Sequence, residues 1–158
     1  MANSPIKSPL PESDKEITGN VLQATLVDLV DLSLIAKQAH WNVVGANFRS
    51  VHLQLDELVS TARTYVDEVA ERANAIGVSP NGKAKTVVES SGLPEYPDNW
   101  QNVEATVAAI VDILADLIER LRKRIDETDK SDLVTQDLLI EITQELEKAH
   151  WMWQAQQA

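Results

Sequence analysis

Apolar residues recur at helical spacing through two long stretches that contain no proline. All six prolines lie outside residues 12–79 and 98–158. This exclusion is typical of long helices, because a proline inside a helix removes a hydrogen bond and clashes with the preceding turn. Gly45 divides the first stretch, within the sequence WNVVGANF. The pattern therefore predicts two helices before the mid-chain prolines and two after them.

The first predicted helix runs from about Asp14 to Asn42, and apolar residues cover much of its circumference. A helix of this kind is expected to be buried against other subunits as well as against its own bundle. The second predicted helix runs from about Asn47, a suitable N-cap, to Ile76, where Gly77 is a suitable stop. The apolar stripe of the first helix comprises Ile17, Val21, Leu22, Leu26, Leu29, Val30, Ser33 and Ile35, with Leu32 and Leu34 lying beside it.

The segment after Gly77 is rich in turn residues and is expected to hold at most one short helix, around Thr86 to Ser90. A third long helix is predicted from about Asp98 or Asn99, and a fourth from about Ser131. Four long helices with one long middle connection predict an all-α four-helix bundle with one crossover. We expect residues 1–13 to form a flexible tail and residues 14–155 a single domain. The fourth helix carries an apolar seam at 3–4 spacing: Leu139, Ile142, Leu146, Ala149 and Trp153.

Composition narrows the class of protein. The chain has 158 residues, 44% of them apolar, which is enough for one hydrophobic core. It has no apolar run long enough to predict a membrane span, and its start lacks the basic-then-apolar order of a signal peptide. The absence of cysteine excludes disulfides and thiolate metal sites. We therefore expect a cytoplasmic protein with no membrane partner.

The formal net charge is −11. An acidic surface repels phosphate backbones, which speaks against simple nucleic-acid binding, and it attracts cations. Solubility alone would explain the same charge, so the charge does not by itself identify a function.

Four ligand-type residues share one face of the second predicted helix. His52, Asp56, Asp67 and Glu71 fall at roughly 0°, 40°, 60° and 100° around its axis. They form two pairs at i, i+4 spacing, and the two pairs are separated by about 16 Å. One ion cannot bridge that gap, because metal–ligand bonds are near 2 Å long.

A second copy of the helix resolves this separation. If it lies antiparallel across a two-fold axis near residues 61–62, His52 and Asp56 of one copy face Asp67 and Glu71 of the other. His40, at the end of the first helix, is the natural further ligand. Two imidazoles with three carboxylates suit iron or zinc better than calcium or magnesium. A single such pair on a helix is more often a solvated face, and a lone histidine is more often structural.

The segment KQAHWNVVGANFRSVHLQLDELVSTARTYVDEVAERANAIG resembles the signature region of the Dps family, the mini-ferritins first known as DNA-binding proteins of starved cells. The HW pair, the following glycine and phenylalanine, and the H-x3-D-E and D-x3-E motifs all stand at the family's spacings. The likeness extends over roughly residues 14–154. It implies a ferritin-like bundle assembled into a hollow dodecamer.

The resemblance implies ferroxidase sites between two-fold-related subunits. His40, His52 and Asp56 would come from one subunit, and Asp67 and Glu71 from its neighbour. The implied activity is oxidation of Fe(II), preferably by hydrogen peroxide, with storage of the ferric mineral and protection against oxidative stress. Zinc or another divalent ion could occupy the same site. Trp41 would pack at the dimer interface or donate an electron to a stray oxidising equivalent.

Two further clusters carry weaker signals. Acids gather around the turn between the last two helices, where the family lines its three-fold pores; helix capping by Asp132 is the alternative. The motif Glu147-x-x-His150 resembles a ligand pair of larger ferritins but has no matching partner, so coincidence is the simpler interpretation. The acids are Asp126, Glu127, Asp129, Asp132 and Asp137.

Two other functions remain open at the level of sequence. Many Dps proteins compact DNA through lysine-rich tails, but residues 1–16 carry a net side-chain charge of −1 and the C-terminal QAQQA carries none. Twelve chains of −11 each would total about −132, so DNA binding and nucleoid association are not expected. The same metal site could serve a hydrolase, because an ion with open positions activates water.

Overall fold

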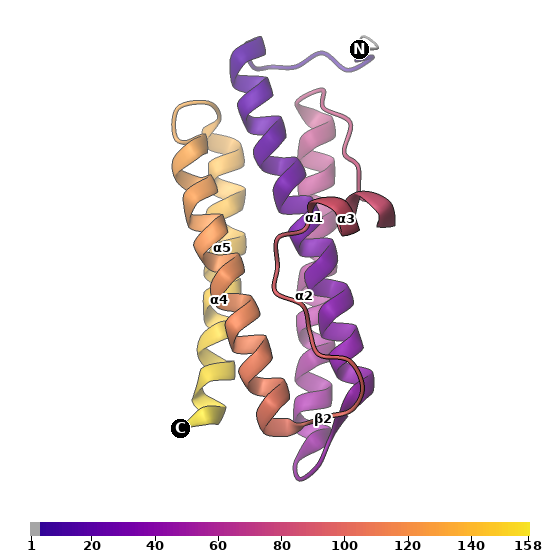
Figure 1. Ribbon diagram of the computed structural model, residues 1–158. Helices are drawn as coiled ribbons and strands as arrows, with labels where there is room; N and C mark the ends of the chain where they lie inside the picture. Colours follow the sequence, from indigo (N-terminus) through magenta and orange to yellow (C-terminus); the bar gives the residue numbers. More distant parts are fainter. Residues whose placement is uncertain (1–3) are drawn as a thin grey trace.

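The computed structural model describes residues 4–158, and they form a helical bundle in agreement with the predicted all-α class (Figure 1). The first three residues of the predicted tail, 1–13, lie outside the described residues. The elements in chain order are α1 (Glu12–Asn42), β1 (Val43–Val44), α2 (Phe48–Ala75), α3 (Ala84–Ser90), β2 (Gln101–Asn102), α4 (Val103–Thr128), α5 (Leu133–Gln154) and the 3₁₀ turn η1 (Ala155–Gln157).

The four long helices form two antiparallel hairpins, α1 with α2 and α4 with α5 (Figure 1). A crossover joins them by running the length of the bundle, from the end of α2 to the start of α4, over the outside of α1. The short helix α3 lies in this crossover. The C-terminus lies at the end of the bundle where α2 and α4 begin.

The crossover ends in a two-stranded parallel pairing that the sequence pattern did not predict. Val43 pairs with Gln101, and Val44 pairs with Asn102. Because residues 101–102 are extended, α4 begins at Val103 and the predicted start near Asp98 or Asn99 is wrong. The Asn102 side chain caps α4 by accepting a 2.8 Å hydrogen bond from the backbone N–H of Ala105.

The predicted limits of the other helices hold to within about two residues. Gly77 has a φ of +78°, the left-handed conformation expected of a glycine that stops a helix. Asn47 does precede α2, but it adopts a φ of 61° and its side chain accepts no capping bond. It therefore directs the chain into the helix through its backbone conformation and not as a conventional cap.

The core lies between the faces that the apolar stripes predicted. Leu22, Leu29, Leu55, Leu139 and Leu146 are fully buried. On α1, Leu32 is also buried although it lay beside the predicted stripe, whereas Ile17 and Leu34 are exposed. By length and composition α1 could cross a membrane, but 67% of its most apolar window is buried inside the molecule, as in the core helix of a bundle.

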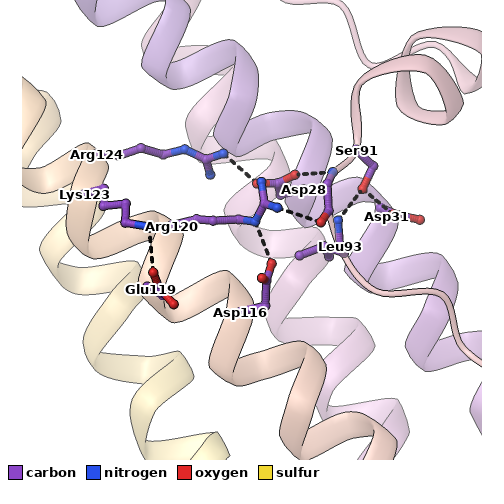
Figure 2. Close-up of polar contacts among 10 residues, drawn as sticks. Asp28, Asp31, Ser91, Leu93, Asp116, Glu119, Arg120, Lys123 and Arg124 are labelled. Carbon is purple, nitrogen blue, oxygen red and sulfur yellow. Dashed lines mark hydrogen bonds and ion pairs between the residues drawn. The ribbon is translucent and has the colours of Figure 1, made fainter.

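A charged network fastens the crossover to the bundle (Figure 2). The Asp28 carboxylate on α1 is 2% exposed and accepts a 2.6 Å hydrogen bond from Arg124 on α4. Arg120 donates to Asp116 at 2.6 Å and to the backbone oxygen of Gly92 at 2.7 Å. Because Gly92 belongs to the crossover, α1, α4 and this connection are held together by ionised groups.

Candidate metal centre

The imidazole rings of His40 and His52 stack with their centroids 3.6 Å apart. His40 is in the last turn of α1, and His52 is in the second turn of α2. The short connection between these helices turns at Gly45, whose φ of +112° is readily adopted only by glycine. This turn brings two side chains that are twelve residues apart face to face.

Each ring is also tied to the backbone of the other residue. Nδ1 of His40 lies 2.8 Å from the carbonyl oxygen of His52, and Nδ1 of His52 lies 2.9 Å from the carbonyl oxygen of His40. A carbonyl oxygen only accepts hydrogen bonds, so both Nδ1 atoms carry the proton. In the neutral rings the lone pair is then on Nε2, which is the form in which a histidine with a fixed Nδ1–H binds a metal ion.

Asp56 adjoins the two rings. Its Oδ1 lies 3.3 Å from Nδ1 of His40 and 2.5 Å from the ammonium of Lys37, and its side chain is 45% exposed. The hydrogen bond from Lys37 lowers the pKa of the Asp56 carboxyl, and the charge of Lys37 adds to this lowering. Asp56 is therefore an anion at neutral pH.

Lys37 was missed by the sequence reasoning. It stands three residues before His40 in KQAH, and residues at i, i+3 on a helix are neighbours. This spacing was the available signal, but a lysine near three expected metal ligands is not itself a ligand type. Its role became evident only from its contact with a side chain of α2.

Asp67 and Glu71 lie on the same side of α2 as Asp56, further along the helix, and both are exposed. Asp67 and Asp56 line one open groove along α2, which also contains Arg63 and Lys37. Within residues 4–158 of a single chain, no three histidine or carboxylate side chains are placed to bind a metal ion together. In one protomer Asp56 adjoins the stacked rings of His40 and His52 without completing a metal site, and Asp67 and Glu71 lie apart from them.

Trp41 points away from the protomer's core and is 66% exposed. It lines a shallow groove between α1 and the crossover, together with Leu34 and Tyr96. Leu34 and Trp41 are both exposed and lie seven residues apart, so they make an apolar stripe on the outside of α1.

One member of each weaker cluster has partners within the protomer. Asp132 is 7% exposed and accepts hydrogen bonds from the backbone N–H groups of Val134 and Thr135 and from Arg72, so it caps α5, the alternative that the sequence left open. Both oxygens of its carboxylate therefore have partners within the protomer. Glu147, beside His150 in the second cluster, is paired with Arg122 at 2.5 Å.

Comparison with known proteins agrees with this architecture. The family model described as a ferritin-like domain matches residues 20–158. The chain is 40% identical over 145 residues to the DNA protection during starvation protein of Mycolicibacterium smegmatis, covering 90% of this chain and 79% of the relative.

Solved structures of Dps proteins also superpose closely on this chain. A tetragonal form of Mycobacterium smegmatis Dps superposes with a TM-score of 0.91 at 37% identity, over 96% of this chain and 92% of the other. The Microbacterium arborescens Dps in its high iron form superposes with a TM-score of 0.89 at 31% identity, over 95% and 97%.

The bundle with one crossover and the matched domain define a ferritin-like protein. Within that class, the chain belongs to the Dps family. Iron storage and protection against oxidative stress are the functions of this family, and its members are homo-oligomers.

Proposed function

We propose that the protein is a ferroxidase that oxidises Fe(II) at sites shared by two subunits. One subunit would supply His40, His52 and Asp56, and its neighbour would supply Asp67 and Glu71. The supporting observation is that the stacked rings of His40 and His52 adjoin Asp56, which lines an open groove. Asp67 lines the same groove further along α2, and Glu71 is one turn beyond Asp67; both are exposed. Each half of the proposed site lacks the ligands that the other half would provide.

The spacing of the ligands supports a two-fold arrangement. Residues 52 and 71 have their midpoint between 61 and 62, and residues 56 and 67 have the same midpoint. An antiparallel copy of α2 centred there brings both pairs together at once, and the symmetry makes two equal sites. We further propose that such dimers assemble into a hollow dodecamer in the cytoplasm, with Trp41 packed at the dimer interface.

The donor set fits the metal chemistry. Carboxylates are hard anionic ligands that favour Fe(III) over Fe(II), whereas imidazoles bind Fe(II) well. Two Fe(II) ions give one electron each to one hydrogen peroxide molecule, which takes up two protons and becomes two water molecules. In this reaction the chain's own groups hold the ions: Nε2 of each histidine donates its lone pair, and the backbone carbonyls keep the rings oriented. Zinc could occupy the same donors and would then act as an inhibitor.

Fe(II) oxidation by hydrogen peroxide, followed through the ferric absorbance beside a protein-free control, tests the proposal. The wild-type protein is expected to accelerate oxidation and keep the iron soluble in a large particle. The double variant His52→Ala, Asp56→Ala is expected to lose at least about 100-fold of the rate while it still assembles. Unchanged kinetics in an assembled double variant would refute the site. Comparison with dioxygen as oxidant tests the preference for peroxide.

Two control assays address the alternative functions. Residues 4–11, which precede α1, contain one basic residue, Lys7, and Lys15 in the first turns of α1 is paired with Glu12 at 2.7 Å, so this end of the chain offers DNA little free positive charge. We expect no retardation of duplex DNA at physiological salt, and a stable complex would restore the DNA-compacting hypothesis. Ester or amide cleavage that depends on added zinc would support the hydrolase hypothesis instead.

A further inference from the structure

Arg63 lies at the centre of the face of α2 that carries the proposed ligands. At 100° per residue it falls about 20° from His52 and about 20° from Asp56, between the two. The residues of α2 that pack into the protomer's core, such as Leu55, Ala62 and Val69, lie on another side of the helix. Arg63 is exposed, and none of the ion pairs within residues 4–158 involves it.

The groove around Arg63 is charged along its length. It has a volume of about 600 Å³. Lys37 and Asp56 lie toward one end, Arg63 lies near the middle, and Asp67 lies toward the other end. A second copy in antiparallel orientation would place Asp56 of one subunit opposite Asp67 of the other, so the cations that could offset these carboxylates are Lys37 and Arg63.

The two-fold axis that would bring the ligand pairs together also determines which residues of the other subunit lie near Arg63. Residues 60 and 63 share the midpoint of the other two pairs, so Arg63 of one subunit faces Ser60 of the other. Asp56 is one helical turn from Ser60, about 6 Å along the axis. Serine is small, and the extended arginine side chain is long enough to cover that distance. Arg63 would reach the carboxylate that Lys37 already contacts from within its own subunit.

We propose that Arg63 is a positioning residue which acts across the subunit boundary as a built-in counter-ion for Asp56. This inference rests on the proposed function and its two-fold geometry. Without metal, each shared site gathers three carboxylates, which repel one another. Lys37 from one subunit and Arg63 from the other offset that repulsion and hold the metal-free interface together. An incoming cation must compete with the guanidinium, so Arg63 also weakens the attraction of the site for metal ions.

Zinc titration of the assembled, metal-free protein tests the proposal, because Zn²⁺ is redox-silent. We compare the wild type with Arg63→Gln, which keeps a polar side chain but removes the charge. Arg122→Gln is the control: it makes the same change on an exposed residue of α4, outside the groove. Removing the charge of Arg63, about one helical turn from the site, is expected to tighten zinc binding on the order of tenfold, while Arg122→Gln leaves it within about twofold.

A second measurement separates this role from simple packing. The urea midpoint for dissociation of the metal-free assembly should fall in Arg63→Gln, and zinc should restore it. A residue that only packs would weaken the assembly with and without zinc and would not tighten binding. Unchanged or weaker zinc binding in an assembled Arg63→Gln protein overturns the inference. If the wild type binds zinc no better than His52→Ala, Asp56→Ala does, the proposed metal site itself fails.

Discussion

Asp28 on α1 and Arg124 on α4 form a buried ion pair at 2.6 Å, with side chains 2% and 11% exposed (Figure 2). The two residues are 96 positions apart in sequence. Gly92 of the crossover adds a long hydrogen bond of 3.5 Å to the same carboxylate. The second terminal nitrogen of Arg124, Nη1, is buried and has no hydrogen-bond partner. The pair is thus the point where the two hairpins and the crossover meet, and the carboxylate balances the one charge that Arg124 brings there.

Removing the Asp28 carboxylate should therefore strongly destabilise the folded protein. Asp28→Ala leaves the Arg124 charge unpaired in the interior, and we expect a loss of about 3–5 kcal/mol in the free energy of unfolding. Asp116→Ala breaks a similar contact with Arg120 at a half-exposed position and should cost under about 1 kcal/mol. Urea unfolding followed by circular dichroism, at one fixed protein concentration, measures both.

Replacing both partners provides the complementary test. The double variant Asp28→Leu, Arg124→Met removes the buried charge together with its counter-ion, so most of the loss in Asp28→Ala should be recovered. If the double variant is as unstable as Asp28→Ala, the destabilisation comes from lost packing and not from an unpaired charge.

The tautomers of His40 and His52 are a second prediction. Because both Nδ1 atoms donate to carbonyl oxygens, the neutral rings of the metal-free protein should be Nδ1–H tautomers. Free histidine favours the other tautomer. Solid-state nitrogen NMR on histidine-labelled protein distinguishes the two forms, with His40→Gln and His52→Gln used to assign the signals. A predominant Nε2–H signal from either residue would contradict the proposed orientation of its ring toward metal.

Asp132 predicts how stability depends on pH. Burial opposes ionisation of this carboxyl, but hydrogen bonds from Thr135 and Arg72 outweigh it, and the pKa of Asp132 is lowered. A lowered pKa in the folded state stabilises the fold above the unfolded-state value of about 3.9. That stability is lost as the pH falls through the lowered value. Asp132 should therefore contribute fully at neutral pH and progressively less below about pH 4.

Two variants separate the cap from the ion pair at this site. Asp132→Ala removes both and should cost about 3 kcal/mol at pH 7. Asp132→Asn keeps a good N-cap and loses only the charge opposite Arg72, so it should cost less. Urea midpoints of Asp132→Asn and wild type should converge as the pH is lowered from 7 to 3. A constant difference over that range would show that the charge of Asp132 is not responsible.

Trp153 predicts the contribution of the C-terminal end of the bundle. It is 1% exposed in the last turn of α5, whereas Gln154 beside it is exposed. Trp153→Ala should destabilise the protein by about 3–5 kcal/mol, because a large side chain leaves a cavity that the helices only partly fill. Gln154→Ala should change the unfolding free energy by less than about 0.5 kcal/mol. Equal effects of the two variants would mean that this end of the bundle is frayed in solution.

Much of the fold was available from the sequence because its signals are local. The absence of proline and the 3–4 spacing of apolar residues determined the number of long helices and most of their limits. Gly77 marked the end of α2 correctly because a left-handed residue after a helix is a local requirement. The pairs His52/Asp56 and Asp67/Glu71 were recognisable for the same reason: helical periodicity alone puts them on one face.

Only the tertiary structure decided what depends on residues distant in sequence. The delayed start of α4 follows from pairing between residues 43–44 and 101–102, and the capping role of Asp132 is reinforced by Arg72, sixty positions away. The contact of Lys37 with Asp56 and the stacking of His40 on His52 require two helices to lie side by side. Helical periodicity specifies which side chains share a face, but packing between elements determines what each face meets.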